Sequence, residues 1–365
     1  MTRTCVPLID PFERRVKDLR ISITDRCNFR CTYCMPEEGM RWLPREELLT
    51  YEEIARVAQV CVERYGFEAI RLTGGEPLVR AHITRLIEML APLGRRQLSS
   101  ANSAESAGPG DGERSVESTH EYVDLALTTN GAKLGEMAHD LREAGLRRVN
   151  VSLDSLRRET FLALTRRDEL DRVLAGIDAA LDAGLAPVKV NAVVMRGVND
   201  TEIVDLARYG RDKGVGMRFI EFMPLDAQDA WSRAQVVPSD EIIERIDAVF
   251  PLEQISDDTV DPAARYVYRD GVGDVGVISS VTEPFCDNCD RVRITAEGQF
   301  RTCLFALEEF DLRAELRAPG GLDAADLDDR LAAAIAGAVG TKWAGHRIGE
   351  ADFVRPGRSM SQIGG

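Results

Sequence analysis

The chain has no long apolar stretch, little histidine and no excess of positive charge. None of its apolar runs approaches the roughly 20 residues that a membrane-spanning helix needs. Residues 1–20 carry charges and prolines and lack the apolar core of a signal peptide, so we expect a cytoplasmic protein with no membrane association. The net charge of −15 repels nucleic-acid backbones, which argues against a DNA- or RNA-binding role.

Histidine is scarce, with four residues, whereas the eight cysteines are clustered. Six of them form two groups, which are Cys27, Cys31 and Cys34, and Cys286, Cys289 and Cys303. In a cytoplasmic chain, clustered cysteines indicate metal or redox chemistry rather than disulfides. The isolated Cys5 and Cys61 are expected to be ordinary thiols.

Short β-like runs alternate with helical patterns up to about residue 230. We expect strands at 19–24, 69–73, 122–128, 148–153, 188–194 and 217–222, and helices at 51–65, 83–90, 133–144, 170–183 and 203–213. Glycines at 66, 145, 184 and 214 follow four of these helices as expected C-terminal caps. Repeated βα units predict an α/β fold with a parallel sheet, either a partial (β/α)6 TIM-like barrel or an open doubly wound sheet. In both folds ligands bind at the carboxyl ends of the strands.

Two parts of the chain depart from this pattern. Residues 94–120 are poor in apolar residues and rich in Ser, Gly and Glu, which predicts a flexible surface insertion. After about residue 230 we expect a hairpin formed by 264–269 and 276–280, and an alanine-rich helix at 322–339. The sequence therefore predicts a large domain, residues 1–232, followed by a smaller α+β domain, residues 233–365.

The first cysteine group has the spacing C-x-x-x-C-x-x-C and directly follows the first expected strand. Thiolates are the usual ligands of iron–sulfur clusters, and a four-iron cluster takes one ligand per iron. Three cysteines would therefore leave one iron open, as in a reactive metal site. Zinc is the alternative, but it needs a fourth ligand and the nearest histidine is His82.

The second group, Cys286, Cys289 and Cys303, again offers three thiols without a neighbouring histidine. A zinc knuckle and a second cluster with an open iron both remain possible interpretations at this point.

The first motif resembles that of the radical S-adenosylmethionine (SAM) enzymes, in which Tyr33 matches the aromatic position before the last cysteine. The family's glycine-rich stretch is matched by Thr73-Gly74-Gly75-Glu76-Pro77, where we expect the glycines to let the backbone approach a ligand closely. The resemblance implies that the open iron of a [4Fe-4S] cluster binds the amino and carboxylate groups of SAM. It further implies SAM contacts by Tyr33, Gly75, Ser152 and Met223.

The whole sequence resembles the GTP 3′,8-cyclase family of molybdenum cofactor biosynthesis. The matching stretches include DLRISITDRCNFRCTYCMP, IRLTGGEPL, LTTNG, RVNVSLDSL, VKVNAVVMRGVND, RFIEFMP, FCDNCDRVRIT and the closing Gly364-Gly365. The resemblance implies that the smaller domain carries a second [4Fe-4S] cluster, whose open iron binds the guanine of GTP.

Basic residues are the preferred partners of a triphosphate, although any single arginine is commonly a solvated surface charge. The resemblance implies a GTP site made of Arg20, Arg71, Thr128, Lys189, Arg218, Arg291, Val292 and Arg293, with Asn130 beside Thr128. We expect the first four basic residues at strand ends, converging on one mouth. Arg291 and Arg293 stand at alternate positions, so in an extended segment their side chains would face the same side. Arg20, Arg291, Arg293, Gly364 and Gly365 are the implied catalytic residues, because in this family the tail reaches the active site.

The implied reaction starts with the cleavage of SAM to a 5′-deoxyadenosyl radical, which takes hydrogen from the ribose 3′ carbon of GTP. Attack on carbon 8 then gives (8S)-3′,8-cyclo-7,8-dihydroguanosine 5′-triphosphate, which a downstream cyclic pyranopterin monophosphate synthase consumes. The resemblance leaves open the reductant and whether the protein is a monomer or a homodimer. The alternatives are a peptide-modifying radical SAM maturase with auxiliary clusters, and a non-catalytic iron–sulfur or zinc scaffold.

Overall fold

The computed structural model describes residues 5–94, 122–226, 230–255, 262–319 and 323–364. The predicted insertion at 94–120 therefore lies almost entirely outside the described residues and stays a prediction. None of the helices in the described ranges is both long enough and apolar enough to span a bilayer.

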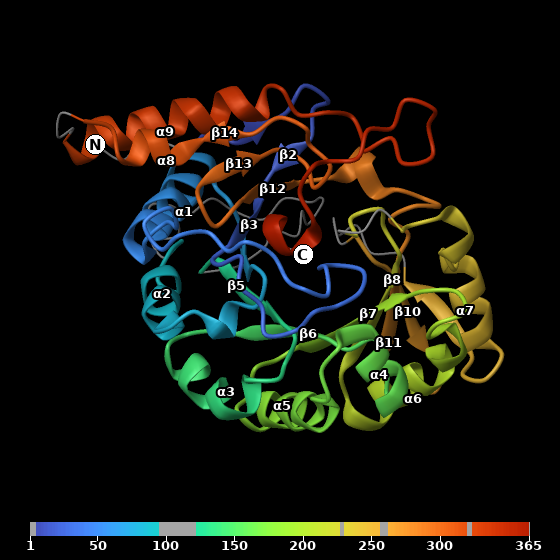
Figure 1. The fold of residues 1–365 in the computed structure, drawn as a ribbon. Helices are drawn as coiled ribbons and strands as arrows, with labels where there is room; N and C mark the ends of the chain where they lie inside the picture. Colours follow the sequence, from blue (N-terminus) through green and yellow to red (C-terminus); the bar gives the residue numbers. More distant parts are fainter. Residues whose placement is uncertain (1–4, 95–121, 227–229, 256–261, 320–322, 365) are drawn as a thin grey trace, which may run out of the picture.

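Six parallel strands follow one another in chain order along one curved sheet (Figure 1). They are β3 (Asp18–Ser22), β4 (Ala69–Thr73), β5 (Asp124–Thr129), β6 (Arg148–Ser152), β7 (Val188–Val194) and β8 (Gly216–Glu221). The helices on their outer side are α1 (Tyr51–Tyr65), α2 (Ile83–Leu90), α3 (Leu134–Glu143), α5 (Leu170–Asp182) and α6 (Ile203–Lys213). The α/β fold and its repeated βα units are thus confirmed.

Local chain chemistry sets the ends of these helices. Thr50 and Glu53 form a capping box at the start of α1, and Gly66 ends the helix with φ 67°. The other three predicted caps, Gly145, Gly184 and Gly214, also have positive φ, at 107°, 72° and 69°. Each of these glycines turns the chain back toward the sheet at the point that the sequence predicted.

The strands of the C-terminal part extend both ends of the same sheet instead of building a second one in the described ranges. At one end β12 (Arg291–Ile294) lies parallel to β3 and is followed by β13 (Gln299–Arg301) and β14 (Phe310–Asp311). At the other end β11 (Asp274–Ile278) lies parallel to β8 and is followed by β10 (Ala264–Tyr268) and β9 (Leu252–Ile255). Strands β10 and β11 are the predicted hairpin. The domain boundary at residue 232 stays a prediction.

Several short elements complete the fold. They are β1 (Leu8–Ile9), β2 (Arg15–Val16), η1 (Pro77–Val79), α4 (Arg158–Thr165), η2 (Asp200–Glu202), η3 (Arg233–Gln235), α7 (Ser239–Asp247), η4 (Phe285–Asn288), α8 (Leu312–Leu316), α9 (Ala324–Val339) and α10 (Met360–Ile363). Helix α9 is the predicted alanine-rich helix, and it packs against α1 and α8. Helix α10 brings the C-terminal end of the described chain inside the arc of strands (Figure 1).

Candidate active site

Polar side chains from several neighbouring strands point to the inner face of the curved sheet. Apolar residues such as Leu19 and Ile21 pack on the helix side, so the alternate residue Arg20 points to the inside. The same alternation turns Arg71, Asn150 and Lys189 inward from β4, β6 and β7. A sheet whose inner face is charged in this way suits a polar ligand better than an apolar core.

Arg20, Arg71, Lys189 and Arg218 lie within their strands and not at the strand ends. Arg20 and Arg71 are the central residues of β3 and β4 and are paired in register, while Arg20 is paired with Arg293 on its other side. The prediction that these residues lie at strand ends was therefore wrong, while their convergence on one site stays a prediction. Hydrophobic periodicity gives the face of a residue, but not its depth along a strand.

Three arginines form a positive cluster, which we call the arginine cluster: Arg293 is buried, and Arg20 and Arg291 are half-buried. Burial and the neighbouring charge of Arg291 lower the pKa of Arg20 to about 10. Burial, with Arg20 and Arg291 beside it, also lowers the pKa of Arg293 well below its usual value. The Nε atom of Arg20 is buried without a hydrogen-bond partner in the described part of the chain. An anion in this place would relieve the repulsion and supply the missing acceptor.

Two of the other predicted cations, Arg71 and Arg218, are already engaged with carboxylates. Arg71 pairs with Asp124 at 2.7 Å and with Asp18 at 3.5 Å, and Arg218 pairs with Asp274 at 2.7 Å. Lys189 is paired in register with Asn150 on the inner face. A ligand would have to compete with these ion pairs, whereas in the arginine cluster the ion pair of Arg291 with Asp290 is longer, at 3.7 Å, and the Arg20 Nε has no hydrogen-bond partner in the described part of the chain.

Val292 separates the two arginines of β12. Its side chain is fully buried in the main core, on the opposite face from Arg291 and Arg293. The prediction of a GTP contact by Val292 can therefore hold only for its backbone, since side chains alternate along a strand.

The glycine-rich stretch packs against the first cysteine loop. The backbone N–H of Gly75 donates to the Thr24 carbonyl at 2.7 Å, and that of Glu76 donates to the Arg26 carbonyl at 2.8 Å. A Cβ atom at Gly75 would lie 2.4 Å from the Arg26 oxygen. The missing side chains thus allow a close approach of two loops, whereas the sequence interpretation invoked the approach of a ligand.

Glu76 of the same glycine-rich stretch connects it to the residues around the first cysteine group. Its buried carboxylate accepts hydrogen bonds from the Thr129 hydroxyl and the Asn130 backbone N–H, both at 2.7 Å. The side-chain amide of Asn130 donates to Asn28 at 2.8 Å and points to the Cys27 sulfur at 3.8 Å. The structure therefore places Asn130 at the first cysteine group, while Thr128 lies on the inner face of β5.

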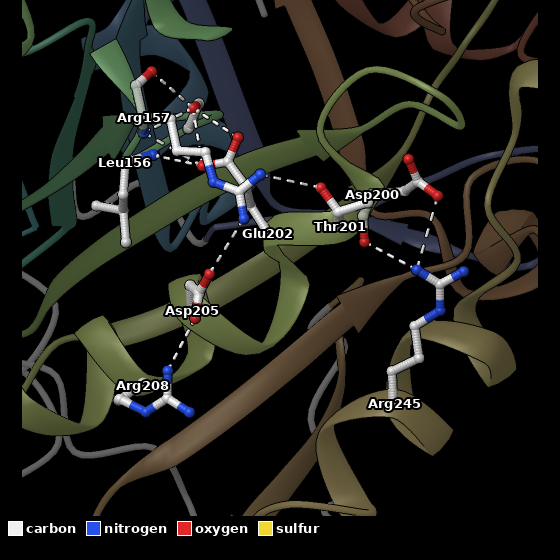
Figure 2. A network of polar contacts seen from close by, with 9 residues as sticks. Leu156, Arg157, Asp200, Thr201, Glu202, Asp205, Arg208 and Arg245 are labelled. Atoms are coloured by element: carbon white, nitrogen blue, oxygen red, sulfur yellow. Dashed lines mark hydrogen bonds and ion pairs between the residues drawn. The ribbon is translucent and has the colours of Figure 1, made fainter. Parts of the chain in front are cut away.

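A second set of polar contacts holds Tyr33. Its hydroxyl donates to Asp154 at 2.5 Å, and the other oxygen of Asp154 accepts from the Val193 backbone at 2.8 Å. The chain just after Asp154 is fixed by Glu202, which accepts from the backbone N–H groups of Leu156 and Arg157 at 3.0 and 3.2 Å (Figure 2). Sequence reasoning missed Asp154 and Glu202, although Asp154 lies in the quoted stretch RVNVSLDSL.

The first cysteine group is half-buried among these loops. Burial raises the pKa of Cys27 to about 12 and that of Cys34 to about 11. Such thiols ionise at neutral pH only when a metal centre binds them. Of the remaining predicted SAM contacts, Ser152 lies on the inner face of β6 and Met223 is half-buried just after β8.

The second cysteine group lies at the β12 end of the sheet, with Cys286 and Cys289 around η4 and Cys303 after β13. The Lys342 ammonium donates to the Arg291 and Thr302 carbonyls at 2.6 and 2.9 Å and lies 3.7 Å from the Cys289 sulfur. Burial opposes ionisation of Cys289, but Lys342 and Arg291 outweigh it and lower the pKa of this thiol. A cavity of about 650 Å³ borders Cys286 and Lys342.

The donor sets fit clusters better than single ions. Across the ranges that the structure describes, no three His, Cys, Asp or Glu side chains converge on one metal position. A four-iron cluster takes one thiolate per iron, so its ligands are spread around a larger body. Three thiolates are enough for a four-iron cluster with one open iron, whereas zinc needs a fourth ligand, and near the second group His346 lines the same cavity as Cys286.

The C-terminal tail links the arginine cluster to the first cysteine group. Arg293 donates to the Gly364 carbonyl, and Ser361 donates from its hydroxyl and its backbone N–H to the Cys34 sulfur. Gly364 has φ 81°, and a Cβ atom there would lie 2.3 Å from the Thr73 hydroxyl. Only glycine fits this position, as the sequence predicted for a tail in a narrow space. Gly365 lies outside the described residues.

Comparison with known proteins identifies both parts of the chain. Residues 21–210 match the model of the radical SAM superfamily, and residues 215–348 match that of Molybdenum Cofactor Synthesis C. In overall fold the protein is similar to Streptococcus suis SuiB bound to S-adenosylmethionine, with a TM-score of 0.52 and 13% identity over 88% of this chain and 68% of that chain.

Curated relatives match over nearly their whole length. The GTP 3′,8-cyclase of Corynebacterium glutamicum is 45% identical over 98% of this chain and 89% of its own length. The GTP 3′,8-cyclase of Streptomyces coelicolor is 45% identical over 98% of this chain and 96% of its own length. The GTP 3′,8-cyclase 2 of Mycobacterium bovis is 44% identical over 99% of this chain and 93% of its own length. The chain belongs to the GTP 3′,8-cyclase family of the radical SAM superfamily.

Proposed function

We propose that this protein is a GTP 3′,8-cyclase, a lyase that converts GTP into (8S)-3′,8-cyclo-7,8-dihydroguanosine 5′-triphosphate, in the first step of molybdenum cofactor biosynthesis. The observation that carries the proposal is the arginine cluster, which is joined to both cysteine groups. Arg291 lies beside Cys289, and Arg293 holds the tail that contacts Cys34. Family membership supplies the reaction, and this geometry supplies a place for an anionic substrate.

The first cysteine group holds a [4Fe-4S] cluster to which SAM binds. When bound, this cluster supplies the electron that cleaves SAM and so provides the radical that takes hydrogen from the substrate. Cys27, Cys31 and Cys34 are its ligands in this proposal, and Tyr33, Gly75, Ser152 and Met223 line the SAM site. The protein contributes a rigid loop, because Glu76 and Asp154 fix its two sides.

The second cysteine group would hold a second [4Fe-4S] cluster through Cys286, Cys289 and Cys303, with the guanine of GTP on its open iron. The arginine cluster would bind the triphosphate, since planar guanidinium groups match phosphate oxygens. Arg71, Thr128, Lys189 and Arg218 would complete the pocket from the other strands. One basic side chain of the cluster would also supply the proton that completes the reduced base.

Placement and exclusion of water are the main tasks of the chain in this reaction, since a primary carbon radical attacks any nearby C–H bond. Gly364 enters the sheet's inner face at Thr73 and Ser22, and the implied role of Gly365 is to extend this closure. The cyclised product would pass to a cyclic pyranopterin monophosphate synthase, and a separate reductant would supply the electrons.

The test is to reconstitute the protein anaerobically with iron and sulfide and to supply GTP, SAM and a reductant. The iron content and the conversion of GTP are then measured. We expect about eight irons per chain, four for each cluster, and conversion of GTP to the cyclic triphosphate. About four irons together with zinc at the second group would contradict the two-cluster site. Cleavage of SAM without conversion of GTP, in protein that holds both clusters, would contradict the proposed substrate.

A further inference from the structure

The Arg14 side chain donates four hydrogen bonds. It lies in the turn between β1 and β2 and is only 8% exposed. Its Nε donates to Asp10 at 2.6 Å, and its Nη1 donates to the carbonyls of Cys286 and Ala344 at 2.6 and 2.7 Å. Its Nη2 donates to the Trp343 carbonyl at 2.6 Å.

These contacts join three segments that are far apart in the sequence. One is the N-terminal hairpin, the second is the loop of Cys286, and the third is the segment 342–346. Cys286 is 272 residues from Arg14. Among these partners only Asp10 forms an ion pair with Arg14, so the guanidinium serves mainly to hold backbone carbonyls in place.

The segment 342–346 forms a wall of the second cysteine group. It begins with Lys342, which reaches the Cys289 sulfur and the carbonyls of Arg291 and Thr302. A Cβ atom at Gly345 would lie 3.2 Å from the Cys286 Cβ atom, so this segment packs directly on a cysteine of the group. Where Arg14 holds the segment therefore decides where Lys342 points.

The chemistry of arginine suits this task. A guanidinium offers five N–H donors in a fixed plane, whereas a lysine offers one point charge on a flexible stem. The buried carboxylate of Asp10 balances the charge and also accepts from the backbone of Phe12 and Arg14, which fixes the turn itself. Without Arg14 the three carbonyls would lose a charged donor that lies at the half-buried junction of the three segments.

We propose that Arg14 is a positioning residue for the second cysteine group. It fastens the Cys286 loop to the segment 342–346 and thereby places the Lys342 ammonium against Cys289. This inference rests on the second cluster of the proposed function. It assigns the N-terminal hairpin, which carries no motif residue, a role in assembling that site.

The test compares Arg14→Met with Arg15→Met in the full chain, reconstituted anaerobically. Arg15 is the matched control, because it lies on the same hairpin but pairs with Glu68 at 3.1 Å. We expect Arg14→Met to hold about four irons in place of about eight and to lose at least about 100-fold in GTP conversion. Reductive cleavage of SAM, which needs the first group alone, should stay within about twofold of the unaltered protein.

Arg14→Lys separates geometry from charge. Because a lysine keeps the charge but lacks the planar fork that reaches Asp10 and the three carbonyls together, we expect an iron content between those of the unaltered protein and Arg14→Met. The inference is overturned if Arg14→Met keeps about eight irons and its GTP conversion. It is equally overturned if SAM cleavage falls together with GTP conversion, because Arg14 would then support the whole fold. If the unaltered protein held only four irons, the proposed function itself would fail.

Discussion

Replacing Cys286 with alanine should abolish the conversion of GTP while leaving the reductive cleavage of SAM intact. Cys286 belongs to the second group, and its carbonyl and its Cβ atom contact Arg14 and the Gly345 segment. No contact of Cys286 with the first cysteine loop is among those of the described residues. The loss of this thiolate removes one of the three ligands that the proposed second cluster needs.

The magnitude expected for Cys286→Ala is at least about 100-fold in GTP turnover, because even small misplacement of a reacting group has that effect. The measurement is the ratio of cyclic product to 5′-deoxyadenosine in one anaerobic reaction mixture. Cys5→Ala is the control, since Cys5 belongs to neither group. This variant should keep both the conversion of GTP and the cleavage of SAM. Intact GTP turnover in Cys286→Ala would show that the second group is not the substrate site.

Replacing Arg293 with alanine should weaken the binding of GTP more than any other single change in the arginine cluster. Arg293 is 6% exposed and pairs in register with Arg20, so it lies at the centre of the cluster. It also holds the Gly364 carbonyl. Its loss removes a buried charged donor, worth about 3 kcal/mol, which corresponds to about 100-fold in the dissociation constant.

The stability of Arg293→Ala without GTP should change much less than its affinity for GTP. Burial and the charges of Arg20 and Arg291 disfavour the charged form of Arg293 and lower its pKa. Arg293→Ala removes this repulsion, so the melting temperature without GTP should not fall by more than the loss of the tail contact explains. The increase in melting temperature that GTP produces should shrink, because that increase follows the affinity of the ligand.

The matched control for Arg293→Ala is Arg208→Ala on α6, whose side chain is exposed and pairs with Asp205 at 2.8 Å. It should leave GTP binding unchanged, since exposed ion pairs contribute little. Equilibrium binding of GTP and of SAM to the anaerobic protein distinguishes the two sites. Weaker SAM binding with unchanged GTP binding in Arg293→Ala would contradict the division of the pocket between the two ligands.

The sequence predicted the repeated βα units well because their signals are local. All six core strands and five helices lie within two residues of the expected bounds. The helices α4 and α7 were not predicted, and their apolar faces are short, with Phe161 and Leu164 on α4 and Ile242 and Ile246 on α7. Such short patterns are difficult to distinguish from loops on periodicity alone.

The residues that support the site could not be predicted in the same way. Asp154 meets Tyr33 across 121 positions of the chain, and Lys342 meets Cys289 across 53. Neither pairing follows from periodicity, because both depend on which loops meet at the edge of the sheet. The cysteine spacing, by contrast, is a local property of the chain, so it indicates both groups directly.

The C-terminal strands show a different limit of local patterns. The end of the repeated βα pattern after residue 230 predicted a smaller domain. In the structure, β12 and β11 from that part of the chain join the core sheet beside β3 and β8. This arrangement brings Arg291 and Arg293 next to Arg20, which neither segment alone could indicate. The arginine cluster is thus a product of strand order.

The most direct test of the central claim is to supply GTP deuterated at the ribose 3′ carbon. If the tail and the two cysteine groups hold SAM and GTP in one pocket, deuterium should appear in 5′-deoxyadenosine together with the cyclic product. Because transfer occurs within the pocket, exchange with solvent should be small. Formation of 5′-deoxyadenosine without deuterium, while GTP is consumed, would contradict the account.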